Sequence, residues 1–164
     1  MKRTLYLMVM LVMLSGCGAV ETFETVADEL VEPVMGQMRG VRLELPEDAA
    51  LAVMGQQDGD TIYLCDGYAL AVQMLQSGDL DETIREVSGF APDQVTVLRT
   101  KTQDADRYEF VWSAVGEGGD QLCRGAILDD GSYHYTLTAM ADAKAAGDLE
   151  RQWDAIFESF RLDQ

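Results

Sequence analysis

Four apolar segments follow one another between residues 95 and 140, and each connection between them is a short polar turn. Alternation of apolar and polar residues predicts strands, and turns of a few residues join antiparallel neighbours. This part of the chain therefore predicts a four-stranded antiparallel meander. The expected strands are Val95–Lys101, Arg107–Val115, Gln121–Leu128 and Ser132–Met140.

Three more strands are expected before the meander. Val41–Leu45 alternates apolar and polar residues until Pro46 ends the pattern. Thr61–Cys65 and Tyr68–Leu75 lie on either side of Asp66-Gly67, a pair typical of a two-residue hairpin turn. Because these two segments are more continuously apolar, we expect both of their faces to be buried.

Two helices complete the expected fold. The first begins with the capping pattern of Asp79 and Glu82 and ends at Gly89, and the second runs from about Asp148 to Leu162. The second helix has a wide apolar stripe, and burial of each large side chain contributes about 1.5–3 kcal/mol, so it must cover a sheet face. The stripe of this second helix comprises Leu149, Trp153, Ile156, Phe157 and Phe160. The expected fold class is therefore α+β, with a mostly antiparallel sheet of about six to seven strands and helices packed on its faces.

The first seventeen residues have the organisation of an export signal. Lys2 and Arg3 precede the apolar run Leu5–Leu14, whose length fits a signal core of roughly 7–15 residues and falls short of the roughly 20 that span a bilayer. The ending Leu14-Ser15-Gly16-Cys17 resembles the lipobox of bacterial lipoproteins, in which the cysteine becomes the first mature residue and carries acyl chains. An ordinary secreted protein or a short uncleaved anchor is the alternative.

The lipobox resemblance makes Cys17 the expected lipid attachment site. It implies a signal peptide over residues 1–16, a lipidated N-terminal helix or tether over 17–40 and a folded domain over 41–164. Two or more acyl chains hold a protein stably in a membrane, so we expect the mature protein on the extracytoplasmic face of the cell membrane. Gly18 follows the cysteine, which is similar to lipoproteins sent to the outer membrane if the cell is Gram-negative.

Charge limits the partners of the mature chain. The sequence has 12 basic and 29 acidic residues, and loss of Lys2 and Arg3 leaves ten basic residues, a formal net charge of -19. Such a field repels nucleic acid and anionic polymers, and it favours solubility or cationic partners. The acidic pairs, such as Asp104 with Asp106 and Asp129-Asp130, lie beside turns and lack the ligand spacing of a calcium loop.

Cys65 and Cys123 are the two thiols that remain once Cys17 is lipidated. A disulfide between them and two free buried thiols are both compatible with an exported domain. Two distant cysteines and the single histidine, His134, cannot supply the ligand spacings of a zinc site. We therefore expect no metal and no cofactor.

Three segments together resemble the PsbP-like α/β/α sandwich family, which includes many small bacterial lipoproteins. They are the opening Val41-Arg42-Leu43-Glu44-Leu45-Pro46, the run Ser132–Thr138 and the closing helix from Trp153 to Phe160. The resemblance covers roughly residues 41–162 and rests on pattern and order. It implies an antiparallel sheet with helices on its faces. Because the family is functionally mixed, it implies no single activity.

No catalytic set is evident in the chain. His134 lies in a predicted strand between Tyr133 and Tyr135, where a hydrogen-bonded strand histidine is the simpler interpretation than a general base. The aromatic residues of the meander are expected to build the core rather than line a groove. The sequence favours a non-enzymatic, lipid-anchored binding or accessory module that engages an envelope protein or component. An envelope enzyme using His134 with nearby carboxylates and a binder of cationic ligands or metal are the alternatives.

Overall fold

The computed structural model describes residues 36–54, 60–116 and 118–163. The expected signal peptide, Cys17 and the N-terminal helix or tether up to residue 35 lie outside the described residues. The described elements are β1 (Val41–Arg42), β2 (Ala50–Met54), β3 (Thr61–Cys65), β4 (Tyr68–Gln76), α2 (Leu80–Ser88), a 3₁₀ turn (Pro92–Gln94), β5 (Val97–Lys101), β6 (Asp106–Gly116), β7 (Gly119–Asp129), β8 (Tyr133–Asp142), α3 (Ala146–Ser159) and β9 (Arg161–Leu162).

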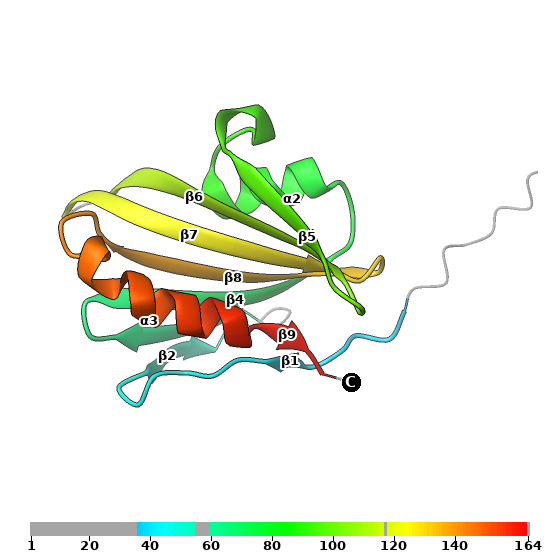
Figure 1. Ribbon diagram of the computed structural model, residues 1–164, viewed down its shortest axis with the longest axis horizontal. Coiled ribbons are helices and arrows are strands. Elements are labelled where there is room, and N and C mark those ends of the chain that lie inside the picture. The colour runs from blue at the N-terminus through cyan, green and yellow to red at the C-terminus, as the bar shows by residue number, and fades with distance from the viewer. Residues whose placement is uncertain (1–35, 55–59, 117, 164) are drawn as a thin grey trace, which may run out of the picture. The chain divides into compact units, whose positions relative to one another are not determined.

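Seven of the strands form one antiparallel sheet in the order β2-β3-β4-β8-β7-β6-β5, and β1 pairs separately with β9 (Figure 1). The meander from β5 to β8 and the β3–β4 hairpin lie where the sequence predicts them. Gly67 has the positive φ of 83° that its hairpin turn requires. The predicted α+β class with an antiparallel sheet and helices on its faces is therefore confirmed.

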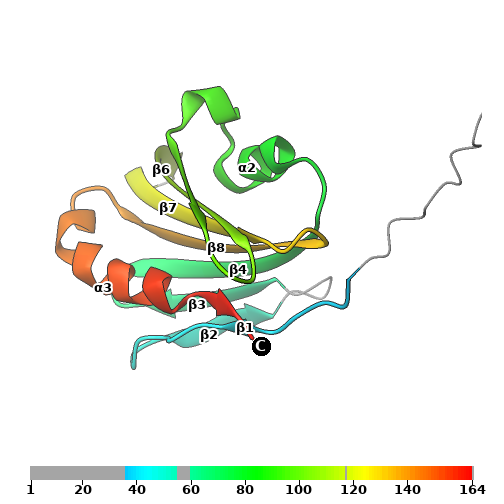
Figure 2. The same ribbon diagram turned by 45° about the vertical axis from the view of Figure 1, so that its right-hand side comes forward.

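The two described helices lie on opposite faces of this sheet (Figure 2). Helix α3 buries Trp153, Ile156 and Phe157 against the face formed by alternate residues of β4, β7 and β8. Helix α2 packs Ile84 on the other face against aromatic residues of β6. The predicted ends of α2 are confirmed, because Asp79 accepts a hydrogen bond from the Asp81 N–H and Gly89 ends the helix with φ 77°.

The ends of the chain differ from the sequence prediction. The first strand stops at Arg42 because the Glu44 N–H donates to Ser159 Oγ at 2.8 Å instead of to a neighbouring strand. Helix α3 ends at Ser159 because Phe160 is extended and the chain then pairs with β1 as β9. Strand β2 is not predicted from the sequence, because its residues Ala50–Met54 lack polar alternation; it pairs with β3 through a register shift.

Residues 36–40, assigned above to the tether, are hydrogen-bonded to the folded domain. Arg39 donates its backbone N–H to Tyr135 Oη and its guanidinium to the Asp163 carbonyl. Asp163 in turn donates its N–H to the Gly40 carbonyl. This segment is therefore held against the folded domain. Neither of the helices described is long and apolar enough to cross a membrane.

Candidate functional site

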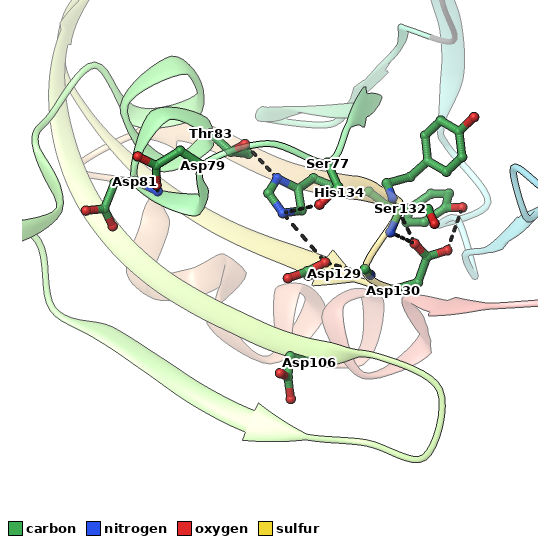
Figure 3. A network of polar contacts seen from close by, with 12 residues as sticks. Ser77, Asp79, Asp81, Thr83, Asp106, Asp129, Asp130, Ser132 and His134 are labelled. Atoms are coloured by element: carbon green, nitrogen blue, oxygen red, sulfur yellow. Dashed lines mark hydrogen bonds and ion pairs between the residues drawn. The ribbon is translucent and has the colours of Figure 1, made fainter. Parts of the chain in front are cut away.

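His134, the candidate catalytic residue, is buried between β8 and the first turn of α2, with 1% of its surface exposed. Its Nδ1 lies 2.7 Å from Thr83 Oγ1 and its Nε2 lies 3.4 Å from Ser77 Oγ (Figure 3). The nearest carboxylate oxygen, Asp129 Oδ1, is 3.7 Å from Nε2, which is too long for a hydrogen bond. The prediction of a hydrogen-bonded strand histidine is confirmed.

This geometry gives His134 a structural role. Both ring nitrogens are in contact with hydroxyl groups, and the ring lies beneath α2 rather than beside a hollow that a substrate could enter. A general base must reach the proton it removes in a plausible substrate position. The arrangement instead joins the start of α2 to the centre of the sheet.

The carboxylates near His134 belong mainly to turns. Asp130 accepts the backbone N–H groups of Ser132 and Tyr133 with one oxygen and the Tyr135 hydroxyl with the other, which closes the β7–β8 turn (Figure 3). Asp129 accepts the Gly131 N–H at 2.8 Å. Within the described ranges, no group of three or more His, Cys, Asp or Glu side chains is placed to hold a metal ion.

The two remaining cysteines are free thiols in the structure. Cys65 lies at the end of β3 on the face covered by α3, and Cys123 lies on β7 on the face covered by α2. Strands β4 and β8 separate β3 from β7, so three strand spacings place the two residues about 14 Å apart. A disulfide requires Cα atoms within about 7 Å. Of the two states that the sequence left open, the structure has the free thiols.

The aromatic residues divide between the two cores. Tyr108, Phe110 and Trp112 are buried under α2, and Tyr135 is buried on the α3 side of the sheet. Tyr133 is partly buried beside Tyr135. The expectation that these residues build the core is confirmed, and none of them forms an aromatic surface for a ligand.

The prediction that β3 is buried on both faces is wrong. On the face that carries α2, Leu64 is 54% exposed and Ile62 is 36% exposed. Helix α2 packs against residues of β6, β7 and β8 and leaves the β2–β4 side of the same face uncovered (Figure 2). The apolar residues that β3 presents on this face therefore lie outside the core.

The sheet register extends this exposed surface over neighbouring strands. Leu64 lies opposite Ala69 of β4, Ala69 lies opposite Met140 of β8, and Ala50 of β2 lies opposite Leu64 on its other side. Met140 is 36% exposed. In the next row, Ile62 lies opposite Ala71. We call this surface the open face and define it as Ala50, Ile62, Leu64, Ala69, Ala71 and Met140.

The row of paired residues that contains Leu64, Ala69 and Met140 continues across the sheet into the part of this face that α2 covers. Met140 lies opposite Cys123 of β7, and Cys123 lies opposite Trp112 of β6. Cys123 and Trp112 are both buried in the cluster under α2. One apolar row across six strands is thus buried at one end and exposed at the other. Contiguous exposed apolar surface of this kind is typical of interaction sites.

Carboxylates border the open face. Asp60 directly precedes β3, Asp66 lies in the β3–β4 turn, and Asp142 ends β8 on the same face as Met140. Glu86 is exposed on α2, three residues after Thr83, whose side chain contacts His134 of β8. None of these four side chains has an ion pair to another residue of the described chain.

The fold is shared with solved structures of distant sequence. The chain resembles the cyanobacterial PsbP protein of Synechocystis, with a TM-score of 0.56 and 11% identity over 76% of this chain and 87% of the other. LpqN of Mycobacterium tuberculosis, described as involved in cell envelope biogenesis, has a TM-score of 0.50 and 15% identity over 77% and 85% of the two chains. The Ran-binding protein Mog1p of Saccharomyces cerevisiae has a TM-score of 0.50 and 10% identity over 74% and 89%.

No family model matches the sequence, and no curated protein matches it either. At identities of 10–15% the structural likeness shows the fold alone, which is PsbP-like. Of the three descriptions, that of LpqN names an envelope process and that of Mog1p names a binding partner.

Proposed function

We propose that this protein is a lipid-anchored accessory module of the bacterial cell envelope that binds a protein partner through its open face. The observation that carries the proposal is the exposure of Ile62 and Leu64 on β3 and of Met140 on β8, on the same face of the sheet with only alanines of β4 between them. Three large apolar side chains in water are costly when they are not covered, and burial of each by a partner would contribute about 1.5–3 kcal/mol.

The partner expected from the border of the open face is a cationic, amphipathic segment. Asp60, Asp66 and Asp142 border the apolar rows without ion pairs in the described chain, so lysine or arginine residues flanking an apolar stripe would complement them. Methionine at such a surface adapts to different side chains. An amphipathic helix of an envelope protein, laid along the sheet, has the required pattern.

The anchor part of the proposal is supported by the sequence of residues 1–17 and by the likeness to LpqN, a protein involved in cell envelope biogenesis of Mycobacterium tuberculosis. Acyl chains on Cys17 would hold the domain at the extracytoplasmic membrane surface, where the expected partner lies. Metabolic labelling with a fatty acid tests this part. The wild-type chain should take up label and fractionate with membranes, whereas Cys17→Ser should do neither. Label on Cys17→Ser would contradict the anchor.

The binding part is tested by purifying the anchored chain from detergent-solubilised membranes and quantifying the proteins that accompany it. Leu64→Asp combined with Met140→Asp should reduce one or more of them at least about tenfold, because a carboxylate in an apolar contact cannot be solvated. Val115→Asp is the matched control, since Val115 is 88% exposed at the β6–β7 hairpin. Equal protein profiles for the two variants would contradict the proposal.

A further inference from the structure

A mixed polar and apolar hollow of about 770 Å³ lies at the opposite end of the sheet from the β3–β4 turn. One wall is the β5–β6 turn with Asp104, and the other is the paired strands β1 and β9 with Arg42 and Arg161. Its floor includes Leu128, which belongs to the α3 core. We call it the C-terminal hollow. Its volume suits a small organic molecule.

The two arginines of the wall are placed unfavourably for folding. Arg42 lies directly opposite Arg161 in the β1–β9 pair, and like charges opposite one another on paired strands cost stability. Arg42 is partly compensated by Asp163, whose carboxylate lies 3.4 Å from its Nε. Arg161 is exposed and has no ion pair with any residue of the described ranges. The hollow therefore offers one uncompensated guanidinium.

The third arginine of the hollow, Arg107, makes its hydrogen bonds within the folded domain. Arg107 donates to the carbonyl groups of Phe157 and Phe160 at the end of α3 and to the Glu109 carboxylate. These bonds use each of its three nitrogens, so Arg107 contributes charge to the hollow but is not available to reorient around a ligand.

Asp104 supplies the opposite charge from the other wall. It is exposed on the β5–β6 turn and has neither an ion pair nor a side-chain hydrogen bond to another described residue. A second hollow of about 260 Å³ shares Asp104 and adds Asp106, Asp129 and Asp130, with Lys101 at its border. The side of the hollow next to Asp104 is therefore acidic, whereas the side next to Arg161 is basic.

From this separation of charge we propose that the C-terminal hollow binds a small zwitterion, with its phosphate or carboxylate group at Arg161 and its ammonium group at Asp104. A simple anion would be repelled by Asp104, and a simple cation would be repelled by Arg161, whose charge no residue of the described ranges compensates. A molecule that carries both charges on a short apolar link can pair its negative group with Arg161 and its positive group with Asp104. Phosphoethanolamine, free or as a lipid headgroup, has this chemistry. The proposal is independent of the open face.

The experiment is a chemical-shift titration of the purified full chain in a neutral detergent with O-phosphoethanolamine, glycerol 3-phosphate and ethanolamine. Phosphoethanolamine should bind most tightly of the three. Arg161→Gln should weaken the binding of phosphoethanolamine and of glycerol 3-phosphate by about threefold or more, which is the loss expected for one partly exposed charge contact. Asp104→Asn should weaken the binding of phosphoethanolamine but strengthen the binding of glycerol 3-phosphate. This opposite response separates a zwitterion site from an anion site.

Arg151→Gln is the matched control, because Arg151 is exposed on α3 and does not line the hollow. It should leave all three affinities unchanged, and Arg161→Lys should retain most of the phosphoethanolamine affinity. Tighter binding of phosphoethanolamine by Asp104→Asn, or equal effects of Arg151→Gln and Arg161→Gln, would overturn the proposal. Vesicles of phosphatidylethanolamine in phosphatidylcholine then separate the sources: binding to these vesicles identifies the headgroup, and binding only in solution identifies the free zwitterion.

Discussion

Two polar side chains, the buried His134 and the partly buried Glu109, each join a helix to the sheet. His134 contacts Thr83 in the first turn of α2. Glu109 accepts hydrogen bonds from Arg107 and Arg124, while Arg107 binds the last carbonyl groups of α3 and Arg124 binds Asp154 of the same helix. Cations at the end of a helix also interact favourably with its dipole. At this scale the polar residues explain the positions of the helices rather than a reaction.

His134→Ala should destabilise the protein by about 2–4 kcal/mol, because it leaves a cavity and a Thr83 hydroxyl without its partner. Chemical denaturation at neutral pH measures the effect. Thr83→Val is the matched control, since it removes the same contact but keeps the ring, and it should cost about 1 kcal/mol. A fully stable His134→Ala chain would contradict the structural role. Function that disappears while stability is unchanged would restore the enzyme hypothesis.

Glu109 makes stability depend on pH. Burial by itself disfavours its charge, but the hydrogen bonds from Arg107 and Arg124 outweigh burial and lower the pKa of the Glu109 carboxyl below 4.5. Because the folded-state pKa is the lower one, this contribution is complete above the ordinary carboxyl pKa and is lost as the pH falls through the lowered value.

Glu109→Gln should therefore reduce stability by about 1–3 kcal/mol at pH 7 and by much less in acid, where the wild-type carboxyl is itself protonated. Unfolding curves recorded from pH 7 down to pH 3 measure the difference between the two chains. Glu158→Gln is a suitable control, because Glu158 is exposed on α3 and has no ion pair in the described chain. A difference that stays constant over this range would contradict the assignment.

At the scale of elements, the two faces of the sheet are filled differently. The α3 face is covered by a helix of 14 residues, whereas α2 has 9 residues and covers the side of the other face near β6. Under α2, Phe110 and Trp112 stack with ring centroids 5.3 Å apart over Gly125 of β7. A side chain at Gly125 would meet both rings at 3.0 Å, so glycine is needed for this close approach.

Gly125→Ala should thus destabilise the protein by about 1–3 kcal/mol, because the stacked rings must move within a packed core. Thermal unfolding and the near-ultraviolet circular dichroism of Trp112 report the change. Gly147→Ala is the control: its Cβ would meet no neighbour in α3, and alanine should stabilise the helix by roughly 0.5–1 kcal/mol. An equally stabilising Gly125→Ala would show that the aromatic cluster is loosely packed.

The same elements show how far the sequence predicts the fold. The meander, the β3–β4 hairpin and the caps of α2 follow from local signals, namely alternation, Asp66-Gly67, Asp79 and Gly89. The length of α2 relative to the width of the sheet is a property of tertiary packing, so the exposure of Leu64 could not be predicted. The one available signal is that β3 is apolar on both faces, and this pattern is the same for a strand buried on both faces and for a strand with one face exposed. The arginine pair of β1 and β9 left no sequence signal, because its members are 119 residues apart.

At the scale of the whole molecule, an acidic domain combines two surfaces of different chemistry. The open face is apolar with an acidic border, and the C-terminal hollow separates basic and acidic walls. The Gly36 N–H donates to Ser132 Oγ in the β7–β8 turn. The open face lies on β2, β3, β4 and β8, so a partner can occupy it without displacing either described helix.

The most direct measurement of the central claim is site-specific photo-crosslinking in intact cells with a benzophenone side chain in place of Leu64. The account predicts one protein adduct of defined mass that disappears when Met140→Asp is added. The same side chain in place of Val115, which is more exposed but lies outside the open face, should give no such adduct. Equal adducts from the two positions, or an adduct from residue 64 that persists in Met140→Asp, would contradict a partner bound at the open face.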